Sequence, residues 1–157
     1  MSTQYQIAQI CLNGHIVTSD TSDRPGSNYC VQCGEQTTSA CENCNAPIRG
    51  IEIAEYVILP LDHPPAFCYN CGNPYEWTRR QIEAAKDLAD EVDNLPEAER
   101  ERAKDSFVDL LSDNPRTKVA VVRIEKLIGR AGPVAGGAIK EIVTSIATDA
   151  AKKMMGL

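Results

Sequence analysis

Six of the seven cysteines form pairs separated by two residues, and this spacing constrains the fold more than any other feature. The pairs are Cys30 and Cys33, Cys41 and Cys44, and Cys68 and Cys71. Two thiolates on one tight turn converge on a single metal, and two such turns supply the four tetrahedral ligands that zinc prefers. Three pairs supply six ligands, whereas two zinc ions need eight.

We predict the remaining two ligands at Cys11 and His15, in the stretch CLNGH. Gly14 stands where a second cysteine would otherwise lie, and the imidazole one residue later reaches around the turn. The ligand count then closes as two zinc ions per chain. The other histidine, His63, lies in the stretch LDHPPAFC and is expected to be a loop residue, which becomes a ligand only if His15 is not one.

An imperfect internal repeat predicts which ligands share a metal. The first copy runs from CLNGHIV to NYCVQCGEQ and the second from CENCNAPI to AFCYNCGNP. Two metal-binding turns at the open end of a β-hairpin make a zinc ribbon, so each copy predicts one ribbon. The expected sites are Cys11, His15, Cys30 and Cys33, and then Cys41, Cys44, Cys68 and Cys71. A cross-braced grouping (first and third pairs on one metal) and a nested one (middle pairs on one metal) are alternatives.

The ligand sets favour a structural role for the metal. A catalytic zinc ion keeps one position open for water, whereas both predicted sites close with protein ligands. A redox role for a Cys-x-x-Cys pair needs a βαβ context, which none of the three pairs has. We therefore expect structural zinc in a protein that is not an enzyme.

The composition of the chain changes near residues 72–78. All cysteines and histidines lie before residue 72, and the remainder is rich in Ala, Glu, Lys and Arg. We expect an α+β protein with a double zinc ribbon of short β-hairpins over residues 1–76. A helical assembly domain, a bundle of about four helices, is expected over residues 77–157.

Capping signals place the expected helices. Thr78 and Gln81 fit a capping box at the start of the first, and Trp77 with Ile82 fits a hydrophobic staple.

Proline and glycine place the others. Pro96 lies in the first turn of the second helix, and Asn114 caps the third. Gly132 and Pro133 end the third, and the fourth runs from about Pro133 to Met155.

Charge is distributed unevenly along the chain. Residues 1–76 hold eight acids against two arginines and no lysine, a net of −6. Residues 77–113 hold eleven acids against six bases, a net of −5, and residues 114–157 hold three acids against eight bases, a net of +5. Because Lys and Arg contacts to phosphate dominate nucleic-acid affinity, the ribbons are expected to bind a protein partner instead.

An apolar run at Val57, Ile58, Leu59 and Leu61 follows an alternating strand-like segment at residues 51–53. Either these side chains pack on the helical half, or they form a loop that docks a partner.

The basic segment 114–157 has three interpretations. Its helices could close an intramolecular bundle with the acidic pair before them, form the seam of a homo-oligomer, or lie on a membrane as an amphipathic pair. Neither a signal peptide nor a transmembrane segment is recognised, so a cytoplasmic location is expected.

The stretches CLNGH, YCVQCG, CENCNAPIRG and FCYNCGNPYEWT, followed by NPRTKVAVVRIEKLIGRAG, resemble an uncharacterised family of small bacterial double-zinc-ribbon proteins with a helical tail. The resemblance covers nearly the whole chain and implies zinc binding and a bacterial cytoplasmic setting, but no activity. CENCN departs from the pattern by lacking the glycine that follows other pairs.

Together these observations predict a zinc-binding adaptor whose ribbons dock a protein partner and whose helices mediate homo-oligomerisation. The alternatives are an effector whose basic C-terminal helices act on membranes and a zinc ribbon that binds nucleic acid.

Overall fold

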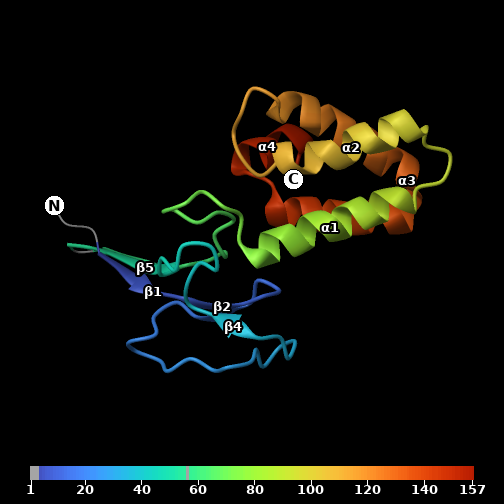
Figure 1. The fold of residues 1–157 in the computed structure, drawn as a ribbon. Coiled ribbons are helices and arrows are strands. Elements are labelled where there is room, and N and C mark those ends of the chain that lie inside the picture. The colour runs from blue at the N-terminus through green and yellow to red at the C-terminus, as the bar shows by residue number, and fades with distance from the viewer. Residues whose placement is uncertain (1–3, 56) are drawn as a thin grey trace. The chain divides into compact units, whose positions relative to one another are not determined.

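The computed structural model describes residues 4–55 and 57–157. The chain divides into two compact units, Met1–Arg79 and Arg80–Leu157, whose elements are drawn in Figure 1. Among the described residues, every strand lies in the first unit, and almost all of the helical residues belong to the second. The predicted α+β class is confirmed, with short β-sheets first and four helices after them.

Two small antiparallel sheets form the first unit, each with three strands. One has the order β1-β5-β6, with bounds Gln4–Ile7, Arg49–Ala54 and Val57–Leu59. The other has the order β3-β2-β4, with bounds Ile16–Thr18, Gln9–Cys11 and Thr37–Thr38.

Strand pairing links the two halves of the repeat. β1 precedes the first repeat but pairs with β5 of the second, with Gln4 opposite Ile53. β4 lies between the two repeats and pairs with β2 of the first. The sequence repeat predicts two hairpins, and these additional pairings join them to neighbouring segments.

The core of the first unit is built around a tryptophan from the start of α1 (Glu76–Asp90). Trp77 is 2% exposed and packs with Ile10, Ile48 and the ring of Tyr75, whose centroid lies 4.5 Å away. Its indole N–H donates to the carbonyl of Pro65 at 2.9 Å. The only tryptophan of the chain therefore belongs to the ribbon core although it lies on a helix.

The predicted capping box at the start of α1 is wrong. The helix begins at Glu76, so Thr78 lies inside its first turn, and the Thr78 hydroxyl donates to the carbonyl of Ala66 at 2.9 Å. Gln81 donates to the hydroxyl of Ser145 instead of reaching back to the helix start. Both side chains that a local cap would use thus form hydrogen bonds with residues distant in the sequence.

The remaining helices are α2 at Glu97–Asp109, α3 at Thr117–Ile146 and α4 at Asp149–Met155. α3 contains the predicted break, because Gly132 has φ 74° and ψ 178° and Pro133 starts a new helical segment. The fourth helix expected from Pro133 to Met155 is itself interrupted at Ala147, which is extended, and Thr148 caps α4 by accepting from the N–H of Ala151.

Apolar side chains of the helical unit form its core. Its fully buried side chains include Phe107, Leu110, Ile124, Leu127, Ile139 and Val143. Within the described part of the chain, no helix has both the length and the apolar character that crossing a membrane requires.

Candidate metal centres

The three Cys-x-x-Cys turns share one backbone hydrogen-bond pattern. In each, the N–H of the first cysteine donates to the carbonyl five residues later, at 2.8 Å. The N–H four residues later donates back to the carbonyl of the first cysteine, at 2.8 to 2.9 Å. A single β-bridge closes each turn, between Tyr29 and Gln36, Ala40 and Pro47, and Phe67 and Pro74.

The return position of each turn has a positive φ. Gly34 and Gly72 have φ 72°, which glycine adopts without steric cost. Asn45 occupies the same place in the turn of CENCN, with φ 58°. Asparagine is among the few other residues that enter this left-handed region, so the missing glycine is replaced without loss of the turn.

The turn that carries the histidine is one residue shorter. The Cys11 N–H donates to the carbonyl of His15 at 3.0 Å, and the Gly14 N–H returns to the carbonyl of Cys11 at 2.8 Å. Gly14 has φ 90°, and a Cβ there would lie 3.2 Å from the Cβ of Trp77. Glycine therefore meets two demands at this position, one from backbone conformation and one from the core.

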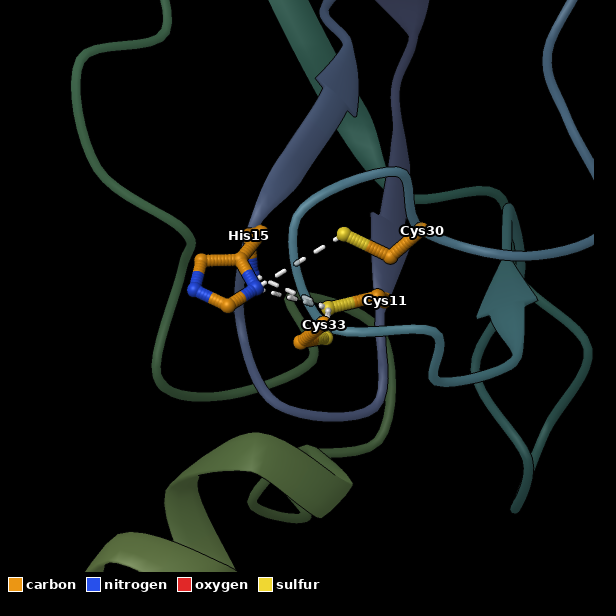
Figure 2. A group of neighbouring side chains, drawn as sticks. All are labelled: Cys11, His15, Cys30 and Cys33. Atoms are coloured by element: carbon orange, nitrogen blue, oxygen red, sulfur yellow. Dashed lines mark hydrogen bonds between the residues drawn. The ribbon is translucent and has the colours of Figure 1, made fainter.

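The first site brings together Cys11, His15, Cys30 and Cys33 (Figure 2). The Nδ1 atom of His15 lies 3.4 Å from the Cys11 sulfur and 3.7 Å from the Cys30 sulfur, and the other ring nitrogen points away from the cluster. The sulfurs of Cys11 and Cys33 are 3.8 Å apart. Nδ1 is thus the histidine atom placed to bind the metal.

The second site brings together Cys41, Cys44, Cys68 and Cys71. The Cys41 and Cys71 sulfurs are 3.7 Å apart, and so are those of Cys44 and Cys68. In both groups all ligand atoms lie within 4.8 Å of one another. The ligands are therefore grouped as the repeat predicts, and not in the cross-braced or nested arrangement. His63 is exposed in a loop and belongs to neither group.

These distances fit tetrahedral zinc. With Zn–S bonds of about 2.3 Å, two sulfurs on one zinc ion lie about 3.8 Å apart, and a nitrogen with a bond of about 2.0 to 2.1 Å lies about 3.6 Å from each sulfur. A disulfide would need about 2.05 Å between sulfurs, and all seven cysteines are free. The two sites are each close enough to hold a zinc ion, so the chain binds two structural zinc ions.

Asparagine amides that the sequence analysis did not single out donate to the sulfurs. The amide of Asn13 lies 3.6 Å from the Cys33 sulfur, and that of Asn70 lies 3.5 Å from the Cys44 sulfur. Each bond joins the two turns of one site. A recurring asparagine two residues after the first cysteine, in CLN, CEN and CYN, is the sequence signal that could have shown them.

Backbone donors also stabilise thiolates. The N–H of Asn73, followed by its side-chain amide at 3.5 Å, lowers the pKa of the Cys71 thiol to about 6. The N–H of Glu35 likewise lowers the pKa of the Cys33 thiol. Burial instead raises the pKa of Cys41 to about 11. Zinc binding requires the cysteine ligands as thiolates, so these N–H groups favour the ligating form.

Two closed zinc-ligand sets on short β-hairpins, followed by four helices, define a double zinc ribbon with a C-terminal helical unit. The chain belongs to the family described as "Uncharacterized protein conserved in bacteria (DUF2321)", whose model matches residues 4–155. The predicted resemblance is thereby confirmed. Neither the curated proteins nor the solved structures contain a significant match to the chain.

Proposed function

We propose that the chain is a non-enzymatic, zinc-stabilised adaptor whose ribbon unit docks a protein partner. The observation that carries this proposal is the exposure of β6. Val57, Ile58 and Leu59 are 53%, 67% and 48% exposed, although they form the most apolar strand of the unit. Ile53, opposite Ile58 on β5, is also exposed, so the apolar surface extends across two strands.

β6 is also an edge strand of its sheet. Exposed edges usually carry charged residues that prevent pairing, especially lysine, and the sequence of β6 contains none. An extended segment of a partner can add to such an edge through main-chain hydrogen bonds, while its side chains contact the apolar face. The bound segment is proposed to be a strand of another protein.

The acidic residues near β6 indicate which charge the partner strand should carry. Glu52, Glu55 and Asp62 lie close to β6 in sequence, and residues 1–76 contain no lysine. A partner strand with lysine or arginine beside its apolar residues is therefore electrostatically complementary, and a second acidic ribbon is not. The closed ligand sets leave the zinc ions a structural role, consistent with an adaptor.

A photo-crosslinking amino acid in place of Val57, introduced in the native host, tests the proposal. We expect a discrete crosslinked protein that disappears when Ile58→Lys is added, with two zinc ions retained as evidence of folding. The matched control carries the crosslinker at Val31, which is 94% exposed on the other ribbon. Crosslinks only between copies of the chain, only to nucleic acid, or equal at both positions would refute partner docking at β6.

A further inference from the structure

A pocket of about 160 Å³ lies between α2 and α3 of the helical unit. It has an apolar floor and a charged rim. The lining residues are Leu95, Glu99, Arg102, Ala103, Arg123, Lys126 and Leu127. Leu95, Ala103 and Leu127 are buried, whereas the cationic side chains are half-buried or exposed.

The three cations of this pocket have no carboxylate partner. Among the described residues, no ion pair joins an acid to Arg102, Arg123 or Lys126, and Arg123 has only a long contact of 3.4 Å to the Ser106 hydroxyl. Glu99, the acid at the rim, is already paired with Arg130 at 3.0 Å. The pocket therefore carries three cations against one carboxylate, and that carboxylate already forms an ion pair with a residue outside the lining.

Other bases of the same helices do find acids. Arg100 pairs with Glu97, and Lys104 pairs with Asp90 at 2.9 Å. The chain has 22 acids against 16 bases, so acids are not scarce. Three unpaired cations at one pocket in an acidic protein are the arrangement that an anionic ligand would complete.

We propose that this pocket binds a phosphate monoester group. Two guanidinium forks can each donate two hydrogen bonds to phosphate oxygens, and the lysine adds a third positive charge. The apolar floor is suited to the carbon skeleton that bears the phosphate. The group could come from a free phosphorylated metabolite or from the headgroup of a phosphatidic acid lipid, which share this chemistry.

The first test titrates inorganic phosphate into the zinc-loaded full chain at constant ionic strength. Binding is monitored by ¹⁵N–¹H correlation spectra. We expect saturable shifts of amides around Arg102 and Arg123, and an affinity at least about tenfold weaker in the double variant Arg102→Gln, Arg123→Gln. The matched control is Lys118→Gln, Lys140→Gln, which removes the same charge from exposed lysines of α3 outside the pocket lining and should bind as the unmodified chain does.

Sedimentation with phosphatidylcholine vesicles, with and without phosphatidic acid, separates the two sources. Saturable phosphate binding without vesicle binding assigns the pocket to a soluble ligand. Vesicle binding that needs phosphatidic acid and is lost in the pocket variant assigns it to the lipid. The proposal is overturned if neither probe binds, or if pocket and control variants weaken binding equally, since that result reports net charge alone.

Discussion

Replacing Trp77 by alanine should destabilise the ribbon unit, although the residue lies on helix α1. The side chain is 2% exposed, and its N–H donates to the Pro65 carbonyl. Trp→Ala substitutions in cores cost about 3–5 kcal/mol. Because zinc binding and folding are coupled in such small units, the loss should appear as zinc affinity weakened by roughly a hundredfold to several thousandfold.

Competition with a chromophoric chelator measures this change. The second site should lose more affinity than the first, because Cys41 and Cys68 belong to the same core cluster as Trp77. Trp77→Phe keeps most of the apolar contact but removes the hydrogen bond, and should cost about 1 kcal/mol from that bond.

The control is Val31→Ala, an exposed apolar position of the same unit, with an expected effect within about 0.5 kcal/mol. If Trp77→Ala keeps its zinc as tightly as Val31→Ala, then the packing of Trp77 does not stabilise the sites and the reasoning fails. Chelation of zinc from the unmodified chain should in addition shift the emission of its single tryptophan to the red.

Four further predictions concern the sites and the assembly. Metal analysis should give two zinc ions per chain. His15→Ala should lose one of them, whereas His15→Cys and His63→Ala should keep both. Loss of zinc in His63→Ala and its retention in His15→Ala would instead make His63 the ligand. Asn45→Gly should preserve the second site, and Asn45→Val should destabilise it by about 1–2 kcal/mol in chelator competition, because a β-branched residue is strained at φ 58°; equal affinities would contradict this. Asn73→Ala removes the side-chain amide that lowers the pKa of the Cys71 thiol, so zinc should be released at a higher pH on acidification, because the thiolate then becomes protonated at a higher pH. An unchanged midpoint of zinc release would exclude a contribution from this side-chain amide. Light scattering should show a homo-oligomer that persists when the ribbons are metal-free, and a monomer at micromolar concentration would remove that prediction.

The ligand positions could be predicted because metal binding imposes local spacing. Cys30 and Cys33 must converge from a single turn, so their separation along the chain carries the signal. The repeat then placed the eight ligands in the same two groups that the structure brings together. After two of the three Cys-x-x-Cys turns, the position of positive φ is also recognisable in the sequence as glycine. Asn45 after the third turn shows that the requirement is for a positive φ rather than for glycine itself.

Tertiary contacts could not be predicted in the same way. Thr78 and Gln81 have the spacing of a capping box, but a carbonyl and a hydroxyl from distant segments take their hydrogen bonds. The pairing of β1 with β5 joins segments about 45 residues apart, and no local pattern specifies it. The interruption at Ala147 lacks the glycine or proline that marks the break at Gly132.

The boundary between the two units falls within helix α1, after its first turn, and not in an extended linker. The ribbon unit therefore cannot be transplanted as a segment that ends where the cysteine-rich part of the sequence ends. A graft that stops at residue 76 leaves behind the indole that fills its core, whereas one that continues to Arg79 carries it along. Recombination between relatives within this helix would likewise have to keep Trp77 with the ribbon in which it packs.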